Sequence, residues 1–389
     1  MQITVVLKQK LETLPPIINL IDCLIDLNIK VNLVCTELSL LNLERYENKI
    51  NIEIIDIPNY RFRPAKIFSI LSFRRRLYNY FDLNNIGKSN ESVIWIASAE
   101  AGMAVGHQIA KYNYVFQVHE LYDKVYHYRF TNGFYFRNSI LNVCPESNRS
   151  AIFRYWYKLK QSPIVLVNAP CKHPRKRNLT ISDELIATKI DALKNKKLIL
   201  YMGMIAFDRD ISILFKKMEL LSNDFHLVLL GRIDGDKQKF IDNINLYKKV
   251  TYLGEMSSPA HLEVASHAYI GVLSYNFFDL NNLFCAPNKI WEYAGFSIPM
   301  LSNEIPGLVN LFNKYNSGRY TNFDYDSNDD LINKILYLDS NYEEISENTK
   351  TMYEDYNYKK QLSVLLEILN VKKSKTNDCV EYFQLLSLK

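Results

Sequence analysis

Short apolar runs alternate with amphipathic segments along the whole chain. A short apolar run predicts a buried strand, and apolar residues three or four positions apart predict a helix. In the first half, strands are predicted at 3–7, 30–35, 52–57, 92–96, 114–118, 140–143 and 164–167. Helices are predicted at 15–27 and 99–111, and another begins near residue 146. This alternation indicates a mostly parallel sheet with helices on both faces.

The same rhythm restarts after a stretch rich in proline and basic residues, at 168–177. Strands are then predicted at 197–201, 226–230, 250–252, 269–272 and 300–301. Helices are predicted at 210–220, 237–246, 260–265, 287–294, 327–338, 342–353 and 358–369. We therefore expect an α/β protein with two Rossmann-like domains whose mostly parallel sheets face a central cleft.

The expected domain bounds follow from this rhythm. They are 1–170 for the first domain, 171–195 for a linker, 196–355 for the second domain, and 356–389 for a C-terminal helix that crosses back to the first domain and ends in a tail. The length of 389 residues and an apolar fraction of 48% suit two hydrophobic cores. A net charge of +5 is too small to indicate a nucleic-acid-binding protein.

The six cysteines are scattered and form no C-x-x-C pair, so they predict neither a disulfide framework nor a zinc site. Such cysteines are typical of a reducing compartment. The apolar run at the N-terminus is too short for a signal peptide, and no run approaches the ~20 residues of a membrane-spanning helix. We expect a cytoplasmic protein that is soluble or bound peripherally at the inner face of the cell membrane.

Several common catalytic motifs are absent. The sequence has no phosphate-binding P-loop, no G-x-G-x-x-G, no G-x-S-x-G and no H-E-x-x-H. Three D-x-D patterns occur, a type of motif that can hold a divalent metal but also arises easily by chance. They are Asp208 with Asp210, Asp234 with Asp236, and Asp324 with Asp326. We expect no metal site.

The second half carries the clearer chemical signals. The predicted strand near 198–202 ends in a turn at Gly203 and Met204, and Arg209 follows just before a helix. Glycine lets the backbone approach a ligand closely, and a helix N-terminus with an arginine favours a diphosphate. The alternative is an ordinary strand–turn–helix unit with a surface arginine.

A second signal lies at 286–302. Pro287 suits the first turn of a helix, Gly295 is expected to cap its end, and Lys289 and Glu292 share one face because they are three positions apart. This cation and carboxylate could hold the phosphates and ribose hydroxyls of a nucleotide. The alternative is a surface salt bridge.

Residues 198–308 resemble the donor-binding domain of GT-B glycosyltransferases, especially bacterial family 4. The resemblance rests on an ordered set of segments: 201–203 with Arg209, 229–231, 252–254, 286–292 and 298–301. The first half resembles the acceptor domain more loosely, through 115–120, 142–146 and 165–168. One position departs from the family, because Phe284 stands where many members carry the first of two glutamates eight residues apart.

The resemblance implies a role for each matching residue. Arg209 and Lys289 would bind the donor diphosphate, Glu292 would accept hydrogen bonds from the ribose, and the turn at Gly203 and Met204 would approach the sugar phosphate. The family also implies catalysis without a metal or cofactor, with a nucleotide-diphosphate sugar such as a UDP-sugar as co-substrate.

His119 and Glu120 follow a predicted strand of the first half. The carboxyl end of such a strand faces the ligand crevice of an open α/β sheet. His119 is a candidate to bind the sugar or acceptor, and Glu120 or Asp123 a candidate general base. The alternative is a loop histidine beside a solvated acid. Glu146 is expected to be a structural helix cap.

The segment 57–81 is basic and aromatic and contains no acidic residue. Its cations include Arg61, Arg63, Arg74, Arg75 and Arg76. Such a surface suits anionic lipid headgroups or a polyprenyl-pyrophosphate-linked acceptor. The alternative is a solvated helix face. Nucleic acid is a weaker reading, since no other feature supports it.

These observations predict a glycosyltransferase that moves a sugar from a nucleotide-diphosphate sugar to a glycan or lipid-linked acceptor in surface polysaccharide biosynthesis, as for a capsule or lipopolysaccharide. Two alternatives remain open. One is a GT-B-like epimerase acting on nucleotide sugars, and the other is a degenerate GT-B subunit that binds without catalysis.

Overall fold

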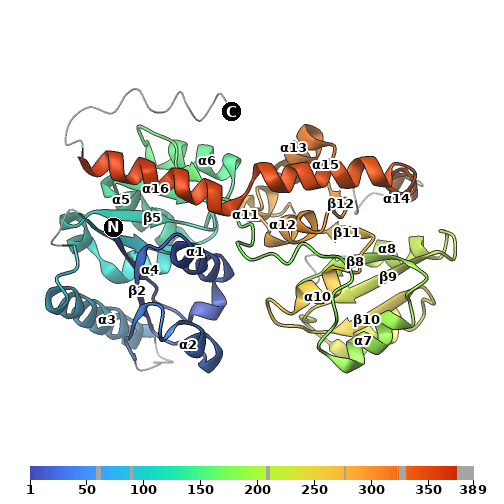
Figure 1. Ribbon diagram of the computed structural model, residues 1–389, viewed down its shortest axis with the longest axis horizontal. Coiled ribbons are helices and arrows are strands. Elements are labelled where there is room, and N and C mark those ends of the chain that lie inside the picture. Colours follow the sequence, from blue (N-terminus) through green and yellow to red (C-terminus); the bar gives the residue numbers. More distant parts are fainter. Residues whose placement is uncertain are drawn as a thin grey trace. The chain divides into compact units, whose positions relative to one another are not determined.

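The computed structural model describes residues 1–57, 63–87, 91–206, 211–275, 277–321, 323 and 330–374. The chain divides into two compact units (Figure 1). Unit 1 comprises Met1–Val167 together with the segment that begins at Tyr358, and unit 2 comprises Asn168–Asn357. Each unit is an α/β layer structure built on its own parallel sheet.

The sheet of unit 1 has seven parallel strands in the order β3-β2-β1-β4-β5-β6-β7. Its central strands are apolar on both faces because helices cover both, and β4 is buried along its whole length. The strands are β1 Gln2–Val6, β2 Lys30–Cys35, β3 Asn51–Ile54, β4 Ser92–Ile96, β5 Tyr114–Gln117, β6 Leu141–Cys144 and β7 Ile164–Val165. The strand order reverses between β1 and β4, which defines the topological switch point of this unit.

The helices of unit 1 connect these strands. They are α1 Pro15–Asp26, α2 Leu40–Tyr46, α3 Arg63–Leu83, α4 Ala99–Val105, α5 Tyr126–Asn138, α6 Ser147–Tyr157 and α16 Tyr358–Ser374, with short 3-10 turns η1 Leu11–Thr13 and η2 His107–Lys111. The helix expected at 99–111 is interrupted at Gly106, which has φ +70 and packs against Arg74: a Cβ there would lie 2.4 Å from the Arg74 Cζ atom.

Helix α16 completes unit 1 from the far end of the sequence. Leu362, Leu365 and Leu369 lie on one face of the helix and are buried. The Gln361 side-chain oxygen accepts a hydrogen bond at 3.3 Å from the N–H of Val167, the last residue of the first segment of unit 1. The apolar stripe and this polar contact explain why a segment so distant in sequence belongs to unit 1.

The sheet of unit 2 has six parallel strands in the order β10-β9-β8-β11-β12-β13. They are β8 Lys197–Met202, β9 Phe225–Leu230, β10 Val250–Gly254, β11 Ile270–Leu273, β12 Met300–Asn303 and β13 Gly318–Thr321. The helices are α7 Glu184–Asp191, α8 Ser212–Met218, α9 Lys237–Ile244, α10 His261–Ala265, α11 Leu280–Leu283, α12 Asn288–Gly295, α13 Pro306–Tyr315, α14 Asp330–Ser340 and α15 Tyr342–Asp355. Here the strand order reverses between β8 and β11.

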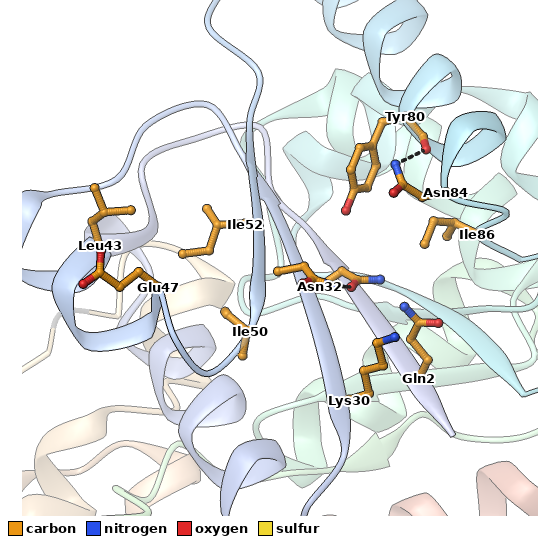
Figure 2. Close-up of a pocket in the computed structure, with 11 residues that line it drawn as sticks. Gln2, Lys30, Asn32, Leu43, Glu47, Ile50, Ile52, Tyr80, Asn84 and Ile86 are labelled. Atoms are coloured by element: carbon orange, nitrogen blue, oxygen red, sulfur yellow. Dashed lines mark hydrogen bonds between the residues drawn. The ribbon is translucent and has the colours of Figure 1, made fainter.

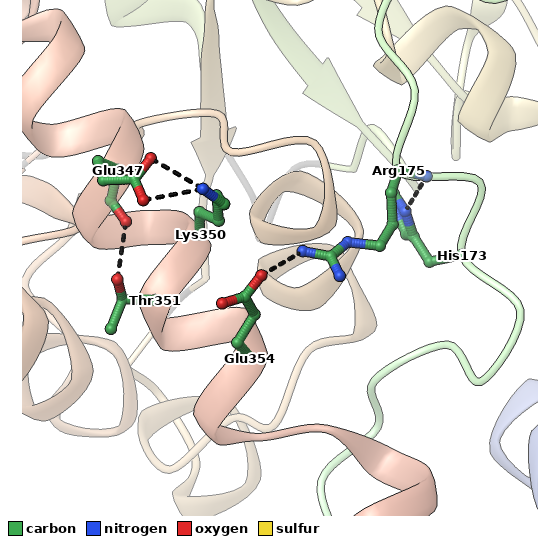
Figure 3. A network of polar contacts seen from close by, with 6 residues as sticks. All are labelled: His173, Arg175, Glu347, Lys350, Thr351 and Glu354. Atoms are coloured by element: carbon green, nitrogen blue, oxygen red, sulfur yellow. Dashed lines mark hydrogen bonds and ion pairs between the residues drawn. The ribbon is translucent and has the colours of Figure 1, made fainter.

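The segment expected to be a linker, 171–195, lies within unit 2 and is not irregular throughout. It contains α7, which Asp183 caps by accepting a hydrogen bond from the Ile186 N–H. Further upstream, Arg175 pairs with Glu354 of α15 at 2.9 Å, as Figure 3 shows. Arg175, one of the basic residues that suggested a linker, thus contacts a helix of unit 2.

Candidate functional site

Three glycines stand at the carboxyl ends of three neighbouring strands of unit 2. Gly203, Gly231 and Gly254 have φ values of +118, +144 and +106, which favour glycine. The Gly203 N–H donates to the Leu230 carbonyl at 2.8 Å, and a Cβ on Gly231 would lie 1.9 Å from the Gly203 carbonyl oxygen. The loops after β8 and β9 therefore touch through bare backbone, which leaves that edge of the sheet open to close approach by a ligand.

Lys289 reaches this edge from α12. A Cβ on Gly203 would lie only 2.1 Å from the Lys289 Nζ atom, so the ammonium group lies directly against the Gly203 backbone. The same Nζ atom is 5.3 Å from the ring centroid of Tyr201 and 5.8 Å from that of Tyr275. Two aromatic faces thus support a cation at the switch point between β8 and β11.

Helix α12 is fixed across the same switch point by Tyr293. The Tyr293 hydroxyl donates to the Leu200 carbonyl of β8 at 2.8 Å. Its ring packs on Gly271 of β11, where a Cβ would lie 2.5 Å from ring carbons. A buried tyrosine that contacts both central strands in this way sets the position of Lys289 and Glu292 one turn or less away.

Glu292 is buried rather than displayed on the surface. It is 9% exposed, and its carboxylate pairs with His261 of α10 through a 3.2 Å contact between His261 Nε2 and Glu292 Oε1. Burial disfavours the charged imidazole, but the Glu292 carboxylate more than offsets this and raises the pKa of His261 above its usual value. The surface salt bridge considered from sequence does not describe this carboxylate.

His173, from the segment expected to be a linker, holds the backbone of the same helix. Its Nδ1 accepts the Arg175 N–H at 3.0 Å, so Nε2 carries the proton and donates to the Glu292 carbonyl at 2.9 Å. Burial lowers the pKa of His173 to about 4, which keeps the ring neutral. Figure 3 shows His173 beside Arg175.

The role expected for Gly295 is wrong. It is the last residue of α12 rather than a cap beyond it, and the left-handed position is taken by Ser297 with φ +58. Glycine is needed at 295 for another reason: a Cβ there would lie 2.6 Å from the ring of His173. Pro287 is the N-cap of the helix, one position before its first turn.

The turn after β8 is held locally. The Tyr201 hydroxyl donates to the Met204 carbonyl at 2.8 Å, which fixes the turn beside Gly203. Arg209 lies outside the described residues. Sequence reasoning missed a second cation, Arg232, which is exposed after β9 and lies 3.9 Å from the Met204 sulfur. Its position directly after a strand-end glycine was the available signal.

In unit 1, His119 follows β5 at the carboxyl edge of the sheet. Both ring nitrogens are buried, and neither has a hydrogen bond of normal geometry to the part of the chain that the structure describes. Burial and then the Arg149 guanidinium lower the pKa of His119 to about 4, against the opposing effect of the Ala97 carbonyl. His119 is therefore a neutral ring with one donor and one acceptor, suited to a hydroxyl group rather than to proton storage.

Glu146 and Arg149 support this histidine. Glu146 caps α6 by accepting the N–H groups of Asn148 and Arg149 at 2.8 and 2.9 Å, which confirms its expected structural role. The Arg149 side chain in turn donates to the His119 carbonyl. Glu120 is exposed next to His119.

The basic segment of α3 divides into inward and outward side chains. Arg74 is half-buried and donates to the carbonyls of Ala104 and Met103 at 2.9 and 3.0 Å, so it completes the end of α4 rather than forming a free surface cation. Arg75 and Arg76 are exposed. Arg61 lies outside the described residues, as does the Arg63 side chain. Among the described helices, none is long and apolar enough to cross a membrane.

A separate cavity of about 560 Å³ lies at the opposite edge of the unit 1 sheet (Figure 2). Gln2, Lys30 and Asn51, the first residues of β1, β2 and β3, line it together with Tyr80 and Asn84 of the segment around α3. Because ligands of open α/β sheets bind outside the carboxyl ends of the strands, this cavity is not the site of His119.

One of the three D-x-D patterns, Asp234 with Asp236, lies in the part of the chain that the structure describes. Asp236 caps α9 by accepting the Lys239 N–H at 3.1 Å. The other two patterns lie outside the described residues. Within the described ranges, no group of three or more His, Cys, Asp or Glu side chains is arranged to hold a metal ion.

No protein-family model matches the chain, and no curated protein matches it in sequence. Solved structures do match it over almost its full length. HepE from Anabaena, solved with UDP, matches with a TM-score of 0.69 and 12% identity over 96% of this chain and 100% of its own. A glycosyltransferase from Rickettsia africae matches with a TM-score of 0.67 and 14% identity over 97% of this chain and 99% of its own. The fold is GT-B.

The GT-B fold expected from the sequence is thus confirmed, as are the two parallel α/β sheets. A putative UDP-N-acetylglucosamine 2-epimerase from Listeria monocytogenes also matches, with a TM-score of 0.65 and 12% identity over 97% of this chain and 99% of its own. Identities this low establish the GT-B fold alone. The activity of the protein depends on the residues that this chain places on the fold.

Proposed function

We propose that the protein is a glycosyltransferase that takes a sugar from a nucleotide-diphosphate sugar, with the donor bound at the carboxyl edge of the unit 2 sheet. One observation carries this proposal. The Lys289 ammonium lies against the bare Gly203 backbone at the strand-order switch point, 2.1 Å from where a Cβ would stand. A fixed cation beside an open backbone is the arrangement that a diphosphate needs.

The chemistry follows from the charge that develops during transfer. Breaking the bond between the sugar and the diphosphate places negative charge on the departing nucleotide. A cation held in advance stabilises that charge without a metal, which is the metal-independent mechanism we favour. Lys289 would fill this role, with Arg209 as a second cation from the family resemblance. The Gly203–Met204 turn would approach the sugar phosphate.

Glu292 would bind the nucleoside end of the donor. Its carboxylate offers acceptors to the ribose hydroxyls, one helical turn from Lys289. UDP is the nucleotide we favour, because HepE was solved with UDP and with UDP-glucose. Phe284 provides no carboxylate at the position of the first family glutamate, so contacts to the transferred sugar must come from other residues.

The acceptor would bind at unit 1. The neutral His119 ring suits a sugar hydroxyl, and the exposed Glu120 is the candidate base. We favour a glycan or polyprenyl-pyrophosphate-linked acceptor in surface polysaccharide biosynthesis. Arg75 and Arg76 are exposed on α3 near the exposed Phe68 and Leu71, a combination that supports peripheral binding to an anionic membrane.

The likeness to the Listeria epimerase favours a second candidate, epimerisation of a nucleotide sugar without transfer. Product analysis separates the two functions. Incubated with a UDP-sugar alone, an epimerase converts the sugar, whereas a glycosyltransferase releases UDP when a glycan or lipid-linked acceptor is added.

Nucleotide binding is tested first, by thermal shift with UDP, GDP and CMP on the wild type, Glu292→Ala and Lys350→Ala. A ligand that binds the native state raises the melting temperature. We expect a shift with one nucleotide that is lost in Glu292→Ala. Lys350, which pairs with Glu347 on the surface of α15, is the matched control and should leave the shift unchanged. No shift with any nucleotide would favour a degenerate binding subunit.

A further inference from the structure

The pair formed by His261 and Glu292 joins two elements that are separate in sequence. His261 begins α10, and Glu292 lies in the middle of α12. Both side chains are mostly buried, at 15% and 11% exposure, and the distance between His261 Nε2 and Glu292 Oε1 is 3.2 Å. A buried carboxylate is unstable as an anion unless a partner compensates its charge. No role assigned so far explains why that partner is a histidine.

We propose that His261 is a positioning residue of the donor site, which holds the Glu292 carboxylate turned so that its second oxygen accepts ribose hydroxyls. This inference rests on the proposed function for its ligand. The pairing itself stands on the geometry alone. His261 takes one carboxylate oxygen, Oε1, and so leaves Oε2 for the ligand.

The surroundings of His261 decide its charge. Glu292 favours the protonated ring by hydrogen bond and by charge, and the Ser257 carbonyl also favours it. Burial and the Lys289 ammonium oppose the protonated ring. Among the described residues, Glu292 also acts on His173 and on Tyr293. Burial lowers the pKa of His173 to about 4 and raises the pKa of the Tyr293 hydroxyl, so that both groups are neutral. The net result is a raised pKa for His261, so the ring is charged at mildly acidic pH.

Protonation therefore links pH to donor binding. With His261 charged, His261 and Lys289 present two positive charges against the single negative charge of Glu292, which favours an anionic diphosphate. As pH rises through the raised pKa of His261, the positive charge of this ring is lost from the site. We expect His261 to strengthen UDP binding below that pH and to lose this contribution above it, a difference seen by comparing the wild type with variants that lack the imidazole.

The pair is tested first without any nucleotide. The ¹H–¹³C NMR signal of the His261 ring is followed against pH in the wild type and in Glu292→Gln, which keeps the shape of the side chain and removes its charge. The inference predicts that the pKa of His261 falls in Glu292→Gln. An unchanged pKa would overturn the pairing, whatever the protein binds.

The second test measures UDP affinity by calorimetry between pH 5.5 and 8.5 in the wild type, His261→Gln, His261→Ala and His267→Gln. We expect His261→Gln, which still donates a hydrogen bond, to lose the part of the pH dependence that comes from His261 and to keep only that of the UDP phosphate, which loses its last proton at about pH 6. His261→Ala should bind about tenfold more weakly at the acidic end. His267 contacts the Leu179 carbonyl at 2.8 Å and serves as the matched control with a wild-type profile.

The outcomes of the two tests are distinguishable. A wild type that binds no UDP at any pH contradicts the proposed donor, while the NMR result still decides whether His261 and Glu292 are coupled. A wild type that binds UDP with the same pH profile as His261→Gln and His261→Ala overturns the positioning role and leaves the proposed function intact.

Discussion

The two sheets reverse their strand order in the same way, but the groups at their carboxyl edges differ in charge. At the edge of unit 2, bare glycine backbone meets the Lys289 ammonium, and the buried Glu292 is paired with a histidine of raised pKa. At the edge of unit 1, His119 has a pKa lowered to about 4 and buried ring nitrogens. The same α/β scaffold thus provides fixed charge in one unit and a neutral hydrogen-bonding ring in the other, which suits a charged donor and a hydroxyl-bearing acceptor.

The largest expected effect concerns the glycine beneath Lys289. In Gly203→Ala, the new Cβ would occupy the place of the ammonium and displace Lys289. We expect UDP to bind about thirtyfold more weakly, a loss of about 2 kcal/mol, because one charge-assisted contact is lost. Calorimetric titration with UDP measures this change.

Gly235→Ala is the matched control for this substitution. Gly235 has φ +117, close to the +118 of Gly203, but has nothing within 4 Å of a Cβ. Both variants should lose about 1 kcal/mol of unfolding free energy through backbone strain. Only Gly203→Ala should lose UDP affinity. Equal losses of UDP affinity in both variants would show that the position of the Lys289 ammonium does not depend on Gly203.

The next largest effect concerns the stability of unit 2, because the His173 ring packs against helix α12. Gly295→Ala would press a methyl group against the buried His173 ring, at a cost of about 2 kcal/mol in unfolding free energy measured by urea denaturation. Combining it with His173→Ala should relieve part of this cost, with a coupling of about 1 kcal/mol. If the losses of unfolding free energy in the two single variants simply added in the double variant, residue 295 and the His173 ring would not be in contact.

Acid is expected to destabilise unit 1 through its buried His119 ring. Because the pKa of His119 is about 4 when folded and 6.5 is the reference value, the unfolded chain binds the proton more tightly, and stability falls as pH decreases from about 6.5 toward 4. We expect His119 to contribute about 2 kcal/mol to the loss of unfolding free energy between pH 7 and pH 5.

Urea denaturation of the wild type and of His119→Gln at both pH values measures this contribution. The variant should lose less stability on acidification because glutamine does not titrate. His267→Gln, a substitution in unit 2, should keep the full wild-type loss. An equal loss of unfolding free energy in the wild type and in His119→Gln would mean that the His119 ring does not cause the destabilisation in acid.

The smallest expected effect concerns the outer face of unit 1. Arg75→Glu with Arg76→Glu should weaken binding to vesicles that contain anionic lipid by severalfold, because each cation contributes at most about 1 kcal/mol and this contribution falls off within a Debye length of the surface. Co-sedimentation measures the change. Lys237→Glu with Lys239→Glu, at exposed positions of α9, is the matched control and should leave binding unchanged. Equal effects would indicate a dependence on net charge rather than on α3.

The fold was predictable because strand position follows from local apolar runs. The runs at 30–35 and 92–96 coincide with β2 and β4. Helix α5 was missed because its aromatic and polar residues show no helical period, and β13 because it is short and only partly apolar. The break at Gly106 depends on Arg74, a contact between distant residues that no local pattern reveals.

The candidate site was predictable to the extent that its residues belong to short motifs. Gly203 and Lys289 were both singled out from sequence, and the structure brings them together. The partners of Glu292 were not predictable. His261 lies on another helix and His173 in a segment without period, so only the tertiary fold shows that both converge on α12.

The most direct test of the central claim compares UDP, UMP and uridine as ligands of the wild type and of Lys289→Met, which keeps an unbranched apolar side chain without the charge. Isothermal titration calorimetry measures all six affinities. The account predicts that the wild type prefers UDP strongly over uridine and that this preference largely disappears in Lys289→Met. An undiminished preference for UDP in the variant would contradict the assignment of the diphosphate site to the switch point of unit 2.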